Sequence, residues 1–127
     1  MMNKFKGFAV FAVAASMLAG GNAFAQDAAA GKKVFMRCVA CHAVKAGAPA
    51  KMGPNLAGVV GRKSGSAAGF KYSAAMQKAN LKWDEATLDK WLTKPAAVVP
   101  GTSMAFAGLP NAADRANVIA YLKKPVD

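Results

Sequence analysis

Apolar side chains recur with helical spacing in several separate segments of the chain. The sequence predicts four helices, over residues 28–41, 73–79, 84–93 and 112–124. Asp27 and Ser73 have side-chain oxygens that can cap the first two helices. In the third helix, Leu88, Trp91 and Leu92 fall on one face. This pattern indicates an all-α protein of one domain, with as much loop as helix.

Two segments between these helices have no sustained periodicity. Residues 43–71 are rich in glycine and proline, and residues 97–110 include Pro100, Gly101 and Gly108, so both are predicted to be loops. A loop as long as the first is uncommon inside a compact domain. Its length becomes sensible if it wraps a large flat ligand that supplies part of the core.

The first 25 residues carry a different pattern. A short basic start precedes an almost unbroken apolar run over residues 7–18, which has the length of the apolar part of a secretory signal and is too short to span a bilayer. The small residues of Ala23-Phe24-Ala25 place the cleavage before Gln26. We therefore expect a cleaved signal peptide at 1–25, export to the periplasm, and a mature domain at 26–127. A retained membrane anchor is the alternative.

The chain is strongly basic, with 17 Lys and Arg side chains against 6 Asp and Glu. Because the predicted signal peptide holds two of the lysines and no acidic residue, the mature domain keeps 15 basic and 6 acidic side chains and a formal net charge of +9. Such a charge favours an anionic partner, here a membrane surface or an acidic protein face. Nucleic acid is not an expected partner outside the cytoplasm.

Cys38 and Cys41 are the only cysteines, and His42, which follows directly, is the only histidine. Two cysteines in an exported chain first suggest a disulfide, but Cys-x-x-Cys-His is the pattern for covalent attachment of haem c. Two thioethers then join one edge of the porphyrin, and the imidazole can bind the iron from below. A thioredoxin-like redox pair would need a βαβ pattern, and a zinc site would need a fourth ligand. The chain offers neither.

The iron of an electron carrier is best closed on both faces, and a thioether sulfur raises the reduction potential. The candidates in the predicted mature domain are Met36, Met52, Met76 and Met104. A methionine more often fills a gap in a core than binds a metal. Met104 differs because it follows Pro100 and Gly101 in a rigid loop, 62 residues after His42. We therefore predict His42 and Met104 as the two axial ligands.

The sequence closely resembles the class I cytochromes c, and specifically their mitochondrial and short bacterial photosynthetic branch. The resemblance runs in order through Gly31-Lys32-Lys33-Val34-Phe35, the haem motif, Gly53-Pro54-Asn55-Leu56, Gly61-Arg62-Lys63-Ser64-Gly65, Gly69-Phe70-Lys71-Tyr72-Ser73, the Met104 loop and Ile119-Ala120-Tyr121-Leu122-Lys123. It implies the class I cytochrome c fold, in which helices and long loops wrap one covalent haem. Gly31 and Phe35 would then meet Tyr121 where the first and last helices cross.

The resemblance also implies roles for individual residues. The backbone carbonyl of Pro54 would accept a hydrogen bond from the axial imidazole and fix its orientation. Arg62, Tyr72 and Trp83 would donate hydrogen bonds to one haem propionate, and Thr102 would help at the other. Core packing is the alternative role for the two aromatic residues, and a solvated surface charge is the alternative for the arginine.

The sequence departs from the family pattern in two places. Trp91 stands where the family usually has a tyrosine that bonds to the ligand sulfur, and Met76 stands where an asparagine is frequent, so the surroundings of the haem become less polar. Relatives also carry lysines beside the exposed haem edge, where this chain has Ala96, Ala97 and Ser103. The basic residues that remain as docking candidates are Lys32, Lys33, Arg37, Lys45, Lys51 and Lys94.

The resemblance implies a mono-haem electron carrier rather than an enzyme. Such a carrier takes single electrons from a cytochrome bc-type complex and passes them to a terminal oxidase or a photosynthetic reaction centre. It would act as a monomer that binds acidic faces of these partners and no small-molecule substrate. A small haem peroxidase or gas sensor is the main alternative, but it would need a distal acid-base residue, and the chain has no second histidine. A dedicated subunit of one periplasmic dehydrogenase is a further alternative.

Overall fold

The computed structural model describes residues 26–127, so the predicted signal peptide at 1–25 lies outside the described residues. The five helices are α1 (Ala28–Phe35), α2 (Ala74–Ala79), α3 (Glu85–Thr93), α4 (Pro95–Val98) and α5 (Ala112–Lys123). Within residues 26–127 the only β pairing is an isolated bridge between Lys63 and Lys82. The expected all-α architecture is confirmed. None of the described helices is long and apolar enough to cross a membrane.

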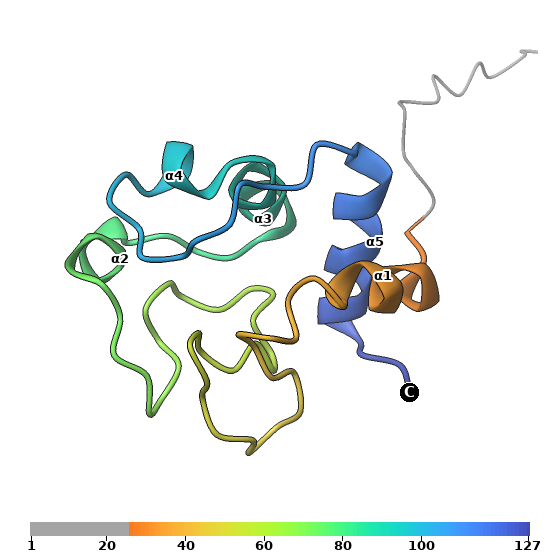
Figure 1. Ribbon diagram of the computed structural model, residues 1–127, viewed down its shortest axis with the longest axis horizontal. Coiled ribbons are helices and arrows are strands. Elements are labelled where there is room, and N and C mark those ends of the chain that lie inside the picture. The colour runs from red at the N-terminus through yellow and green to blue at the C-terminus, as the bar shows by residue number, and fades with distance from the viewer. Residues whose placement is uncertain (1–25) are drawn as a thin grey trace, which may run out of the picture.

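The first and last helices cross at one end of the molecule, α3 and α4 lie along the edge opposite the long 42–73 loop, and α2 lies at the end away from the crossing (Figure 1). Gly31 makes the crossing close, because a Cβ at this position would collide with the backbone carbonyl of Asn117. Beside it, the rings of Phe35 and Tyr121 pack with their centroids 5.2 Å apart. The expected contact between the first and last helices is confirmed.

Side-chain caps mark where helices α2, α3 and α5 begin. Ser73, Asp84 and Asn111 accept hydrogen bonds from backbone N–H groups in the first turns of α2, α3 and α5, at 3.1, 2.8 and 3.1 Å. These caps satisfy N–H groups that have no partner within the helix. The predicted positions of these three helices are confirmed to within a residue at each end.

Two predictions of secondary structure were wrong. The first helix ends at Phe35 rather than at residue 41. Beyond it, the N–H groups of Arg37 and Cys38 bond to carbonyls three residues earlier, at 3.1 and 2.7 Å, which is the tighter spacing of 3₁₀ turns. Residues 95–98 form α4, although a loop was expected from residue 97. Pro95 occupies the first turn of α4, where its missing N–H group leaves no bond unmade.

The loop over residues 99–110 is attached to α3. The backbone N–H of Leu109 donates to the carbonyl of Leu92 at 2.7 Å. Gly108 has a positive φ of 118°, and a Cβ there would collide with the carbonyl of Thr93. Only glycine combines this conformation with so close an approach. The loop that carries Met104 is thereby held against a helix rather than left free.

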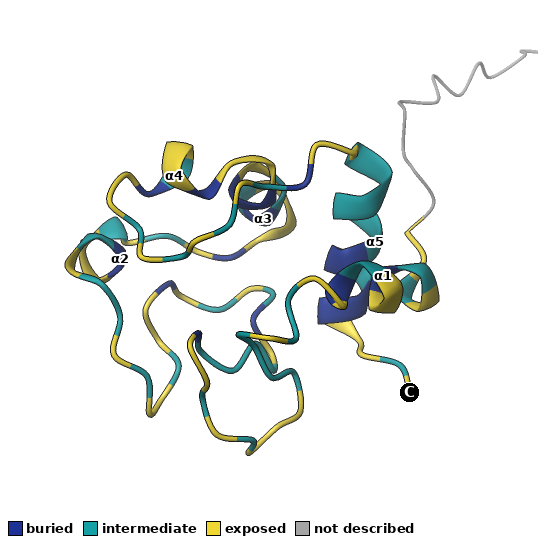
Figure 2. Ribbon diagram, in the orientation of Figure 1, coloured by how far each residue is buried: buried dark blue, intermediate teal, exposed yellow. Residues whose placement is uncertain are grey.

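The buried residues lie on α3, on α5 and at separate positions along the loops (Figure 2). They include the tryptophan pair Trp83 and Trp91, whose ring centroids lie 5.3 Å apart, and Met76 of α2. The side chains of this core do not fill the interior completely. They form one wall of a cavity that faces the long loop.

Candidate cofactor site

A cavity of about 250 Å³ lies between the cysteine segment, the long loop and α3. Every residue that was predicted to bind the haem lines it, namely Cys38, Cys41, His42, Pro54, Arg62, Tyr72, Trp83, Thr102 and Met104. These residues come from segments far apart in the sequence, and folding brings them around one space. The position of each agrees with its expected role, and the roles themselves stay predictions.

The imidazole of His42 is oriented by the chain around Pro54. Its Nδ1 lies 2.8 Å from the Pro54 carbonyl oxygen. Because a carbonyl can only accept, Nδ1 must carry the proton, and the lone pair is therefore on Nε2. Burial lowers the pKa of His42 below its ordinary value, against the effect of this hydrogen bond, which raises it. A neutral imidazole with a free Nε2 is the form that binds a metal.

The two cysteines lie on the turns that follow α1. The backbone N–H groups of Cys41 and His42 both bond to the carbonyl of Cys38, at 3.1 and 2.9 Å, so the three side chains share one tight turn. The thiols are half-buried and not joined to each other. Burial raises the pKa of the Cys38 thiol, while the nearby Arg37 opposes this shift. Both cysteines line the same cavity.

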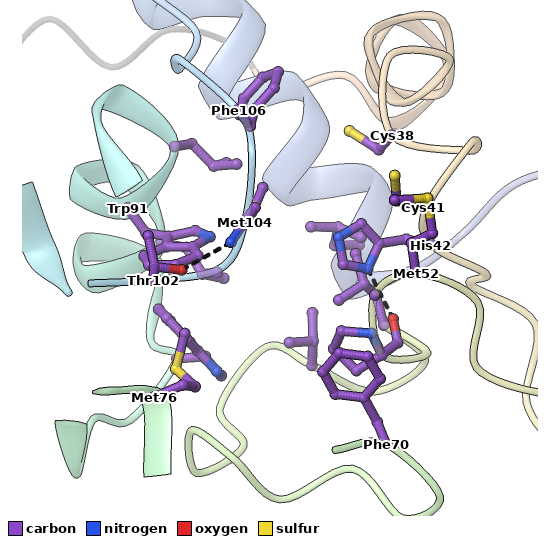
Figure 3. A pocket seen from close by; sticks show the side chains of 18 of the residues that line it. Cys38, Cys41, His42, Met52, Phe70, Met76, Trp91, Thr102, Met104 and Phe106 are labelled. Atoms are coloured by element: carbon purple, nitrogen blue, oxygen red, sulfur yellow. Dashed lines mark hydrogen bonds between the residues drawn. The ribbon is translucent and has the colours of Figure 1, made fainter. Parts of the chain in front are cut away.

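Met104 lies across the cavity from the histidine. Figure 3 shows Met104, Thr102 and Trp91 on one side, and His42 with Cys41 on the other. The hydroxyl of Thr102 accepts a hydrogen bond from the backbone N–H of Met104 at 3.2 Å. A positive φ of 85° at Gly101 turns the chain into this loop. The side chain of Met104 is therefore presented by a defined turn.

Arg62 provides a test of whether the cavity suits a ligand with anionic groups. Its two terminal nitrogens donate to the carbonyls of Ala57 and Asn55, at 2.8 and 3.3 Å. Its Nε is buried and has no hydrogen-bond partner. A buried donor without an acceptor costs about 1–3 kcal/mol, and a carboxylate in the cavity would remove this cost. A propionate of haem is such a group, so this residue fits the predicted cofactor.

Tyr72 and Trp83 also have hydrogen-bond donors that a carboxylate could accept from. The hydroxyl oxygen of Tyr72 accepts from the backbone N–H of Ala67 at 2.9 Å, which leaves its proton free to donate. Trp83 is buried, and its indole N–H is a donor only. With Arg62 they give the cavity several donors in an otherwise apolar lining. This is the chemistry required to hold a flat apolar ring that ends in carboxylates.

The two residues noted as departures from the family pattern also line the cavity. Trp91 and Met76 are both buried, with exposed fractions of 7 % and 9 %. Two aromatic residues of the lining, Phe70 and Phe106, were given no role by sequence reasoning. Phe106 follows Met104 by two positions, and Phe70 packs edge-on against Tyr72 with centroids 4.9 Å apart. Alternation with known site residues along the chain is the signal that identifies these two phenylalanines.

Known proteins are similar to this chain in both sequence and fold. The family model described as cytochrome c matches residues 28–124. Cytochrome c2 of Rhodoblastus acidophilus is 52 % identical over 100 residues, which cover 79 % of this chain and 94 % of that protein. Cytochrome c2 iso-2 of Magnetospirillum fulvum is 57 % identical over 89 residues, covering 70 % and 92 %. The solved structure of cytochrome cH from Methylobacterium extorquens superposes with a TM-score of 0.72 at 46 % identity, covering 76 % of this chain and 97 % of that one.

Proposed function

This chain belongs to the cytochrome c family, and from that premise we propose that it is a periplasmic carrier of single electrons. Members of the family hold haem c covalently and are electron carriers, not enzymes. Haem iron, when bound, supplies a one-electron couple between its ferrous and ferric states. The work of the protein is to hold that couple in nearly constant surroundings and to present it to partners.

We propose that Cys38 and Cys41 form the thioether bonds and that His42 and Met104 are the axial ligands. The observation that carries this assignment is their arrangement, with the imidazole and the methionine on opposite sides of one cavity and both thiols at its edge. The hydrogen bond from His42 to Pro54 supports it further, because it directs the Nε2 lone pair away from the carbonyl.

The remaining lining residues receive roles in binding the propionates. Arg62, Tyr72 and Trp83 donate to one carboxylate, and Thr102 acts near the other. The unpartnered Nε of Arg62 supports this assignment most directly. Hydrogen bonds to a buried carboxylate offset the cost of removing its charge from water.

The partners that we propose are a cytochrome bc-type complex as donor and a terminal oxidase or photosynthetic reaction centre as acceptor. The relatives from Rhodoblastus acidophilus and Magnetospirillum fulvum are cytochromes c2. The strong positive charge of residues 26–127 supports docking to acidic faces. All six basic docking candidates are exposed, from Lys32 to Lys94. Ala96, Ala97 and Ser103 are also exposed, so one part of the surface near the Met104 loop is uncharged. We expect the carrier to be monomeric, and we propose neither nucleic acid nor a small-molecule substrate as a ligand.

A visible absorption spectrum combined with a redox titration of the purified protein tests this proposal. The expected result is a covalently retained pigment with a six-coordinate low-spin spectrum in both oxidation states and a reversible one-electron couple. A high-spin spectrum that changes when carbon monoxide or peroxide is added would instead favour an enzyme or a gas sensor. Osmotic release of the protein from intact cells tests its location, because a periplasmic protein leaves the cell without lysis.

A further inference from the structure

Three hydrogen bonds join the segment 51–54 to residues 38–42, which form the haem-binding turn. The Nζ of Lys51 donates to the carbonyl of Val39 at 2.9 Å. The backbone N–H of Gly53 donates to the carbonyl of Cys41 at 2.8 Å. The Nδ1 of His42 donates to the carbonyl of Pro54 at 2.8 Å. Of these three bonds, only the first is made by a side chain of the segment itself.

The segment also lies in direct contact with the imidazole. A Cβ on Gly53 would collide with ring atoms of His42, so the backbone at Gly53 lies directly against the ring. A further bond closes the segment on itself, from the N–H of Lys51 to the carbonyl of Gly53 at 3.1 Å. A displacement of Lys51 would therefore also displace the nearby carbonyl of Pro54, which orients the imidazole of His42.

Lys51 differs from the other lysines in what its ammonium contacts. Among the described residues it is the only lysine whose Nζ donates to a backbone carbonyl. The carbonyl in question belongs to Val39, between the two cysteines. The hydrogen bond to Val39 holds the positive charge of Lys51 beside the haem-binding turn.

We propose that Lys51 is a positioning residue that clamps the Pro54 segment onto the haem-binding turn and whose fixed charge raises the reduction potential of the haem. The inference rests on the function and axial ligand proposed above. The ferric state carries one more positive charge than the ferrous state, so a cation held nearby destabilises it and favours reduction. Lys51 is exposed, so solvent and salt weaken the effect without reversing its sign.

This assignment changes how one docking candidate is understood. Lys51 was counted with the basic residues available to an acidic partner. Its ammonium uses one of three donors on the Val39 carbonyl, so Lys51 stays available to a partner and gains a second role in tuning the haem.

The experiment compares Lys51→Gln, Lys51→Arg and Lys78→Gln in the full holoprotein. Lys78 is an exposed lysine of α2 that does not line the cavity, so its substitution removes one charge without touching the clamp. The measurement is the midpoint potential by spectroelectrochemistry, at low and at high ionic strength. We expect Lys51→Gln to lower the midpoint potential by more than Lys78→Gln does. The shift caused by Lys51→Gln should be smaller at high ionic strength than at low ionic strength. Lys51→Arg keeps both a charge and a donor, so its midpoint stays near that of the wild type.

Two outcomes would overturn the proposal. Equal shifts for Lys51→Gln and Lys78→Gln would mean that only net charge matters. A shift of the same size for Lys51→Arg would mean that the charge has no part in it. If Lys51→Gln does not accumulate with haem, Lys51→Met, which keeps the apolar stem, replaces it in the same comparison.

The visible spectrum of each variant separates this test from the test of the proposed function. A wild type without a low-spin spectrum refutes the axial ligation and leaves nothing for Lys51 to tune. A low-spin wild type with no specific effect at Lys51 refutes only the clamp.

Discussion

Gly31 of α1 lies directly against the backbone carbonyl of Asn117 in α5, with no room for a Cβ between them. This contact sets how closely the first and last helices cross, and the Phe35 and Tyr121 rings pack beside it. The turn that carries both cysteines begins where α1 ends. The crossing therefore positions one wall of the haem site, although it contributes no ligand.

Substituting Gly31 with alanine should destabilise the folded protein. Alanine is the better helix former by about 1 kcal/mol, but overpacking a close contact costs typically about 1–3 kcal/mol, and more where the obstacle is rigid. Because the obstacle here is backbone, we expect a net loss of at least ~1 kcal/mol in the free energy of unfolding. Denaturant unfolding of the holoprotein measures it. Lys33→Ala, at an exposed position of the same helix, serves as the control, and equal stability of the two variants would contradict the close crossing.

Replacing Met104 with alanine should change the spectrum and the potential together. The proposed sulfur ligand stabilises the ferrous state, so its loss should remove the sulfur-to-iron charge-transfer absorption and lower the midpoint potential. Met36→Ala is a matched control, because Met36 is 65 % exposed and lies outside the cavity lining. An unchanged spectrum in Met104→Ala would mean that another group binds the iron.

Changing Cys38 and Cys41 together to serine should leave a protein without retained pigment. The haem then has no covalent attachment, and the cavity in the core loses the ligand that fills it. We expect the variant to lack a cooperative unfolding transition, because a domain of this size has a modest core without its cofactor. Circular dichroism in the near and far ultraviolet measures this. A fully folded, colourless variant would show that haem is not part of the core.

How much of the fold could be predicted depended on capping residues. Asp27 and Ser73 were predicted as caps, and both accept hydrogen bonds from the first turn of a helix, because such short-range chemistry is readable from sequence. The end of α1 was not readable, because good helix formers continue past Phe35 while the chain tightens into the haem-binding turn. The helical turn of α4 was missed because a turn of four residues has too few positions to show periodicity.

The site was predictable where residues carry specific chemistry. The cysteines and His42 form a motif, Met104 follows a rigid turn at Pro100 and Gly101, and Arg62 was found through the resemblance of whole segments. Phe70 and Phe106 were given no role, because in a loop only their spacing of two residues from Tyr72 and Met104 indicates which way they point. The hydrogen bond from Lys51 to Val39 was equally unreadable, since a lysine in a basic chain looks like any other surface charge.

The rate of electron transfer to an anionic reagent should fall steeply as salt is added. The formal charge of +9 on residues 26–127 attracts anions over long distances, and salt screens this attraction with a Debye length of about 10 Å at 0.1 M. Hexacyanoferrate(III) is a suitable oxidant, measured by stopped-flow absorption. A cationic cobalt complex is the matched control, and its rate should rise with salt. Rates indifferent to ionic strength for both reagents would contradict electrostatic steering.

Arg62 gives a prediction that joins stability and potential. Its terminal nitrogens hold two carbonyls of the long loop, and its Nε has no protein partner. Replacing it with glutamine removes these bonds and the charge beside the proposed propionate. We expect a loss of about 1–3 kcal/mol in the free energy of unfolding.

The midpoint potential of Arg62→Gln should also fall, because a positive charge near the haem favours the reduced state. Arg62→Lys keeps the charge but not the planar set of donors. Its midpoint potential should therefore stay close to that of the wild type, while its free energy of unfolding should fall nearly as much as that of Arg62→Gln. Arg37→Gln removes an exposed arginine at the cavity edge and serves as the control for net charge. If the midpoints of Arg62→Gln and Arg37→Gln coincide, the propionate is not held by Arg62, and the orphaned Nε must have another explanation.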